Sequence, residues 1–178
     1  ILMPPTKGKP NRRGIARREQ IIEAAIELFA TDGYRGTGLL GLAQRVGMSH
    51  SGILRLFGTK ENLLRAVMEH RDRELGEVNR DMLDGDIFAI LNPRQAFEPP
   101  IYTRLNAVLY AESLNPDAPL HTYFLETSRT ARDFMAQRIE AAQRSGEIRA
   151  AIDAQTQATE IVRFHLGLEV QWVLDPNG

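Results

Sequence analysis

The fold is decided by the stretch Thr37-Gly-Leu-Leu-Gly-Leu-Ala-Gln-Arg-Val-Gly-Met-Ser-His-Ser-Gly-Ile-Leu-Arg-Leu-Phe-Gly-Thr-Lys-Glu61, in which two short helical patterns meet at a glycine. In the first pattern, apolar residues recur at i, i+3, i+4 and i+7, the spacing of one helix face. They are Leu39, Leu42, Ala43 and Val46. The hydroxyl of Thr37 is expected to cap this helix, and Gly47 to end it in the left-handed conformation that a tight turn between helices requires.

A second helix is expected to begin directly after Ser49, whose hydroxyl suits the N-cap position. Its buried stripe is predicted to be Ile53, Leu56 and Phe57. The other face is polar or small at its N-terminal end, where a recognition helix meets base edges. Thr59 is expected to cap a further helix at once, with Glu61 in its first turn, where a carboxylate suits the helix dipole. The stretch therefore predicts a helix-turn-helix, although its spacing alone fits an ordinary pair of core helices equally well.

This run resembles the DNA-binding domain of TetR-family transcriptional regulators across roughly residues 14–66. The resemblance is carried, in order, by Asp32-Gly33-Tyr34, Thr37, Leu42-Ala43, Val46-Gly47-Met48-Ser49, Ile53, Phe57 and Thr59-Lys60-Glu61-Asn62-Leu63. The chain departs from the family pattern at Gly38, Leu54 and Leu56; the family usually has at position 54 a tyrosine that donates to a backbone phosphate. The resemblance implies an N-terminal DNA-binding head, an effector cavity in the second domain and a dimer paired through the last two helices.

Composition sets broad bounds on the class of protein. The chain has 178 residues, 43% of them apolar and 25% charged, which is ordinary globular composition. No apolar run approaches the roughly 18 residues of a membrane span and no signal-peptide pattern is present, so a cytoplasmic protein is expected. With no cysteine, disulfides and thiolate chemistry are excluded.

Charge is divided unevenly along the chain. Residues 1–60 hold ten Lys or Arg against four Asp or Glu, whereas residues 61–178 hold twelve against nineteen. The N-terminal part therefore suits the phosphates of nucleic acid. The acidic part is more simply interpreted as solvated helix faces than as an acidic binding site.

Three domains are predicted along an all-α chain: a basic arm at residues 1–13, the helix-turn-helix domain at 14–66, and an effector-binding and dimerisation domain at 67–178. The arm could lie on DNA or be a tail that is basic by chance. A first helix is expected over residues 15–31, ended by Asp32-Gly33. Arg17 and Arg18 near its start could reach phosphate or belong to a solvated face.

About nine helices are expected in all. The helix after Thr59 is predicted to run on as a connector between the domains, so that movement of its far end must move the head. Residues 81–100 are rich in helix breakers and predict short helices. Longer helices are expected over residues 101–114, from Pro119 to Ser145, and after an Asp153 cap to Leu174.

The last helix is apolar over more of its circumference than one core contact needs, which indicates a second surface. Two long antiparallel helices of this kind commonly dimerise as a four-helix bundle. The predicted dimerisation residues are Phe134, Ile161, Phe164, His165, Leu168 and Trp172.

The predicted DNA contacts follow from the geometry of a recognition helix. His50, Ser51 and Arg55 are expected to read base edges, and Gly52 to allow close backbone approach. Thr37, Ser49 and Lys60 are expected at phosphates. Because a two-fold dimer presents two such helices, the expected partner is double-stranded DNA carrying a near-palindromic operator.

The second domain is expected to bind a small apolar or amphipathic effector, as the resemblance implies. Ligand sites in helical bundles have apolar walls and few polar anchors. The candidate residues are Phe88, Tyr102, Arg104, Tyr110, His121 and Phe124. Aromatic residues in such positions are more often core than pocket.

The predicted function is that of a ligand-responsive transcriptional regulator, acting as a repressor that its effector releases from the operator. An enzyme is not expected, because the sequence has no Glu-x-x-His pair, His-Glu-x-x-His, Gly-x-Ser-x-Gly, phosphate-binding glycine loop or cysteine nucleophile. The four histidines have no metal-ligand spacing, so neither a metal nor another cofactor is expected. The alternative is an architectural DNA-binding protein without a ligand, which predicts no cavity and no ligand effect on DNA affinity.

Overall fold

The computed structural model describes residues 12–84, 100–149 and 151–176. These residues form seven helices, where about nine were expected, and they contain no strand. The prediction of short helices over 81–100 falls largely on residues 85–99, outside the described ranges, while residues 81–84 belong to a longer helix. Most of the predicted basic arm also lies outside these ranges, and its last two residues begin the first helix.

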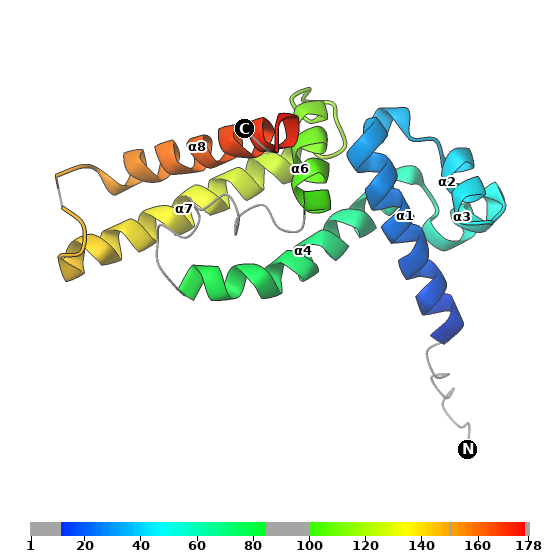
Figure 1. The fold of residues 1–178 in the computed structure, drawn as a ribbon, viewed down its shortest axis with the longest axis horizontal. Coiled ribbons are helices and arrows are strands. Elements are labelled where there is room, and N and C mark those ends of the chain that lie inside the picture. The colour runs from blue at the N-terminus through cyan, green and yellow to red at the C-terminus, as the bar shows by residue number, and fades with distance from the viewer. Residues whose placement is uncertain (1–11, 85–99, 150, 177–178) are drawn as a thin grey trace, which may run out of the picture.

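Three helices form the N-terminal head: α1 (Arg12–Gly36), α2 (Leu39–Arg45) and α3 (His50–Phe57) (Figure 1). Gly33 interrupts α1 with φ 74° and ψ 172°, a backbone conformation that is essentially restricted to glycine. The predicted helix end at Asp32-Gly33 is therefore confirmed as a break, followed by one more helical turn. Large side chains of the head are fully buried, among them Phe29, Leu42 and Ile53.

The remaining described helices are α4 (Lys60–Asp84), α6 (Pro100–Glu112), α7 (His121–Ser145) and α8 (Ala154–Leu174). Figure 1 shows α7 and α8 as a long antiparallel pair, with α6 standing between this pair and the head. The predicted cap at Asp153 is confirmed, because its carboxylate accepts from Thr156 N at 2.8 Å. The predicted start of α7 at Pro119 is wrong; residues 113–120 form turns, and the helix begins at His121.

Two separate clusters of buried apolar residues hold the chain together. The larger one runs from the head into the helices beyond it, since Leu105, Leu109 and Phe124 belong to the same cluster as Phe29. The smaller one joins α7 and α8 around Ile139. The head is thus packed against α6 through a shared core. The boundary between the two domains at residue 66 stays a prediction. Among the described helices, none is long and apolar enough to cross a membrane.

Candidate nucleic-acid interface

The turn between α2 and α3 is built around Gly47, which has φ 62° as predicted. Met48 N donates to Ala43 O at 2.8 Å and closes the turn. The guanidinium of Arg17 donates to Val46 O at 2.9 Å, so a side chain of α1 stabilises the turn. Arg17 therefore serves the fold of the head, which neither of the two roles predicted for it described.

The start of α2 differs from the prediction. Its N-cap is Gly38, and no side chain caps the helix. Thr37 is instead 3% exposed, and its hydroxyl donates to Gly33 O at 2.8 Å across the break in α1. The hydroxyl thus bonds back to the end of α1, and the burial of the side chain does not favour the predicted contact between Thr37 and a phosphate.

The N-terminal end of α3 presents a polar surface. Ser49 caps the helix as predicted, its hydroxyl accepting from Gly52 N at 3.1 Å. The side chains of His50, Ser51 and Arg55 are exposed on the same helix. Ile53 and Phe57 are buried beneath them, so the helix is locked to the head with its polar side outward.

Two residues of α3 lie differently from the prediction. Gly52 is buried, and a Cβ there would meet Met48 Cε at 3.0 Å and Ser49 Oγ at 3.2 Å. Crowding inside the turn therefore gives this glycine a role within the head, and its close approach to DNA stays a prediction. Leu56 was expected in the buried stripe but is 38% exposed.

Lys60 and Tyr34 form a contact beside the recognition helix. The ammonium of Lys60 lies 4.2 Å from the centroid of the Tyr34 ring, and the Tyr34 hydroxyl donates to Glu61 at 2.8 Å. Burial lowers the pKa of Lys60, and the nearby carboxylates of Glu112 and Glu61 partly oppose this effect. Burial and the hydrogen bond to Glu61 raise the pKa of Tyr34. The predicted phosphate ligand Lys60 is thus held in place by its contact with Tyr34.

Thr59 caps α4 as predicted, because its hydroxyl accepts from Asn62 N at 3.1 Å.

A carboxylate of α6 reaches across to the end of α1. Glu112 accepts from Tyr34 N at 2.7 Å and from Arg35 N at 3.2 Å. These amides begin the single helical turn after Gly33, where N–H groups have no partner within the helix. Glu112 therefore caps the turn that leads into α2. This contact was missed by the sequence reasoning, because it joins residues 77 and 78 positions apart.

A cavity of about 250 Å³ lies between α6, α7 and α8. It brings together three of the predicted ligand-binding residues, Tyr110, His121 and Phe124. Tyr102 packs instead against the core that the head shares with α6, and Arg104 is exposed outside the cavity lining. Phe88 lies outside the described residues. The full lining is Tyr110, Ser113, Leu114, His121, Phe124, Leu125, Ser128, Arg132, Val162, Arg163 and Leu166.

The predicted dimerisation residues divide by exposure. Phe134 on α7 is 36% exposed and Phe164 on α8 is 57% exposed. The others are half-buried within the single chain; they are Ile161, His165, Leu168 and Trp172. Exposed apolar side chains on both long helices provide a surface that a second copy could cover.

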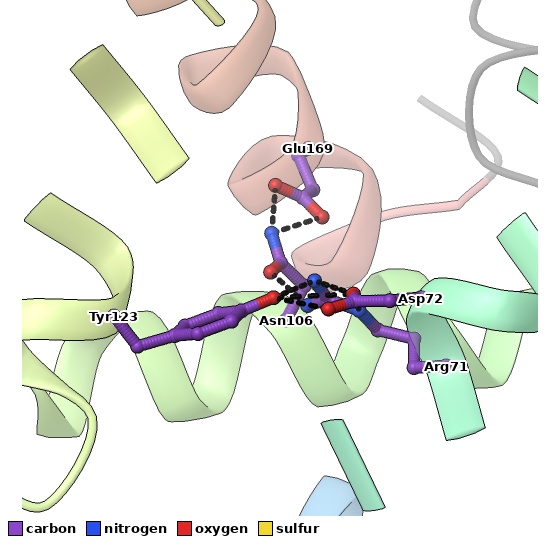
Figure 2. A network of polar contacts seen from close by, with 5 residues as sticks. All are labelled: Arg71, Asp72, Asn106, Tyr123 and Glu169. Atoms are coloured by element: carbon purple, nitrogen blue, oxygen red, sulfur yellow. Dashed lines mark hydrogen bonds and ion pairs between the residues drawn. The ribbon is translucent and has the colours of Figure 1, made fainter. Parts of the chain in front are cut away.

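A polar network links four helices, α4, α6, α7 and α8 (Figure 2). Arg71 of α4 donates to Asn106 Oδ1 of α6 and to the Tyr123 hydroxyl of α7, both at 2.7 Å. The Asn106 amide donates to both oxygens of Glu169 on α8, at 2.9 and 2.8 Å. Burial raises the pKa of Glu169 to about 7, with Asn106 and Arg71 opposing the shift.

The network in Figure 2 ties the connector helix α4 to the rest of the second domain. Asp72 completes it by accepting from Arg71 and from the Tyr123 hydroxyl. None of its five members was among the predicted site residues. The only signal in the sequence is a lone Glu169 within an apolar helix pattern, which does not identify its partners.

Comparison with known proteins agrees with the geometry of the head. Residues 21–67 match the family of bacterial regulatory proteins, tetR family. The HTH-type transcriptional repressor Rv3405c of Mycobacterium tuberculosis is 34% identical over 67 residues, which are 38% of this chain and 36% of that protein. The match thus spans about a third of the length of such curated relatives.

Solved structures resemble the chain over most of its length. One, described as the molecular basis for control of antibiotic production by bacterial hormones, has a TM-score of 0.68 and 28% identity over 91% of this chain and 88% of that one. AibR, solved with isovaleryl coenzyme A and operator DNA, has a TM-score of 0.68 and 19% identity. The match covers 91% of this chain and 89% of AibR, which shows a shared fold. Residues 21–67 therefore form a DNA-binding domain of the TetR type, and the whole chain has a fold that resembles solved structures of such regulators.

Proposed function

We propose that the chain is a ligand-responsive repressor that binds a near-palindromic operator as a homodimer. The observation that carries this proposal is the arrangement of α3. Its polar first turn is exposed, while Ile53 and Phe57 anchor its other side in the core. A short helix fixed in this way can enter a major groove without losing its packing.

Within this interface, His50, Ser51 and Arg55 are placed to read base edges. Arginine can donate to both O6 and N7 of guanine, and this pair is the commonest specific contact in the major groove. Ser49 and Lys60 flank the helix and are proposed to bind phosphates. Thr37 and Gly52 are left out of the proposed contacts, because both are buried.

Dimerisation is proposed through the exposed apolar surface of α7 and α8, around Phe134 and Phe164. A dimer would present two α3 helices to one face of a duplex. The two half-sites should then lie about one helical turn apart, 34–36 Å. This spacing is the feature that an effector could change.

The cavity between α6, α7 and α8 is proposed as the effector site. Its wall includes Ser113, the first residue after α6, next to Glu112, which caps the turn leading into the head. A ligand that shifts the end of α6 would therefore bear directly on the head. Ligand binding would favour a conformation whose two heads no longer fit the operator, with a coupling of about 1–3 kcal/mol.

The experiment that tests this proposal is selection of random duplexes by the full chain, followed by fluorescence anisotropy on the selected sequence. A regulator should select a sequence with two-fold symmetry and bind it at least about a thousand times more tightly than random DNA. Selection without any sequence preference would favour the architectural alternative. The cavity supports a ligand-responsive regulator over that alternative, which predicts no cavity.

A further inference from the structure

The cavity lies where the packing of the second part of the chain is interrupted. Phe124 and Tyr110 border it from the side of the larger core cluster, and Val162 from the side of the smaller one. The rings of Tyr110 and Phe124 meet edge to face, with centroids 5.3 Å apart. The hollow thus has a firm apolar wall contributed by both clusters.

The charged groups of the lining all have one sign. Arg132 comes from α7 and Arg163 from α8, so the two facing helices each contribute a guanidinium. The lining contains no aspartate or glutamate. This is unexpected by composition, because residues 61–178 carry an excess of seven acidic residues.

Neither guanidinium has a hydrogen-bond or ion-pair partner among the described residues, 12–84, 100–149 and 151–176. Arg163 is exposed to water, but Arg132 is half-buried, whereas a charge without a partner normally stays in water. Two arginines beside an apolar hollow are a suitable receptor for an anion that carries an apolar group.

We propose that this cavity binds a small amphipathic carboxylate, with the carboxylate between Arg132 and Arg163 and the tail against Tyr110 and Phe124. The inference rests on the proposed effector site and names the chemical class of its ligand. The volume of about 250 Å³ suits a tail of medium length. A cationic ligand would be repelled, and a neutral one would bring no negative charge to the two guanidiniums.

The test compares three ligands with the same tail by isothermal titration calorimetry on the full chain: octanoate, octanamide and octylamine. Octanoate is expected to bind about 10- to 100-fold more tightly than octanamide, because charged partners roughly double the strength of such hydrogen bonds. Octylamine is expected not to bind. Equal affinity for octanoate and octanamide would overturn the proposal, as would the failure of all three to bind.

Variants locate the preference in the cavity. The double variant Arg132→Gln and Arg163→Gln should lose the preference for octanoate while it keeps weak octanamide binding, which also shows that it folds. Arg129→Gln, an exposed arginine of α7 outside the lining, is the matched control and should keep the preference. A double variant that still prefers octanoate would place the anion site elsewhere.

A DNA-release assay separates this inference from the proposed function. If octanoate binds as expected but leaves operator affinity unchanged, the ligand class stands and the effector role fails. If octanamide binds as tightly as octanoate and releases the operator, the effector role stands and the carboxylate preference fails.

Discussion

Removal of the Glu112 carboxylate should weaken both the stability of the chain and the link between cavity and head. In Glu112→Ala, the amides of Tyr34 and Arg35 lose acceptors at 2.7 and 3.2 Å. Hydrogen bonds to charged groups contribute about 1.5–3 kcal/mol each. These two share one partly exposed carboxylate and water can replace it, so we expect a total loss of about 1–2 kcal/mol.

Thermal denaturation gives the first measurement. For a chain of this length, a loss of 1 kcal/mol lowers Tm by about 2–4 °C, so Glu112→Ala should melt roughly 2–8 °C lower. Glu112→Gln keeps one acceptor oxygen without the charge, so its Tm should lie between that of Glu112→Ala and that of the parent chain. Glu126→Ala, an exposed glutamate on α7, is the matched control and should melt as the parent chain does.

Gly33 provides an independent check on the same contact. A Cβ at this position would lie 2.7 Å from Glu112 Oε1, in a backbone conformation that costs other residues about 1–3 kcal/mol. Gly33→Ala should therefore destabilise the chain through both a clash and backbone strain. In the Glu112→Ala background only the strain remains, so the two substitutions should not be additive.

The functional measurement is the ratio of operator affinities with and without a ligand that releases the operator. Glu112→Ala should reduce this ratio more than it reduces operator affinity itself, because α6 would no longer hold the turn before α2. If Glu112→Ala matches Glu126→Ala in both Tm and ligand response, Glu112 does not couple the cavity to the head.

Three further substitutions test other parts of the structure. Arg55→Ala should cost about 1–3 kcal/mol on the operator and much less on random DNA, as measured by anisotropy; an equal loss on both would refute a base-reading role. Phe164→Glu places a charge on the exposed apolar surface of α8 and should produce monomers in sedimentation velocity, whereas an unchanged dimer would put the interface elsewhere. Glu169→Gln should stabilise the chain at high pH. The pKa of Glu169 is raised to about 7 in the folded state, from near 4.5, so the folded state keeps its proton between these values and loses stability as pH rises through them. The gain over the parent chain should be absent below about pH 4.5 and reach at most about 3 kcal/mol above pH 7, measured by denaturation at several pH values. A gain that does not change with pH would show that Glu169 is not the titrating group.

Much of the local helical structure could be predicted from the sequence, because the signals that define it lie close together in the chain. Ser49, Thr59 and Asp153 cap their helices through bonds to amides three residues further on, and a serine, threonine or aspartate before a helical pattern is enough to predict this. Gly33 and Gly47 have positive φ, as their places at helix ends indicate. The polar first turn of α3 followed from the helix period once its start was known.

Errors in the prediction also arose among neighbouring residues, where several local contacts compete for one side chain. Thr37 was expected to cap α2, but its hydroxyl donates to Gly33 O, four residues earlier. A Cβ at Gly52 would meet Met48 Cε and Ser49 Oγ, four and three residues earlier, so the packing of the turn already restricts this position. The sequence identifies a small or polar residue in each case, and the backbone geometry determines which neighbour that residue contacts.

The sequence by itself determined the helix-turn-helix and the caps at Ser49, Thr59 and Asp153, since each depends on residues within one or two turns of one another. Only the tertiary structure decided how the head is joined to the rest: Glu112 meets Tyr34 from 78 residues away, and Glu169 meets Asn106 from 63. Local spacing carries no information on such pairs, because they form only when α6 packs between the head and α8. The same packing leaves the hollow that Arg132 and Arg163 border.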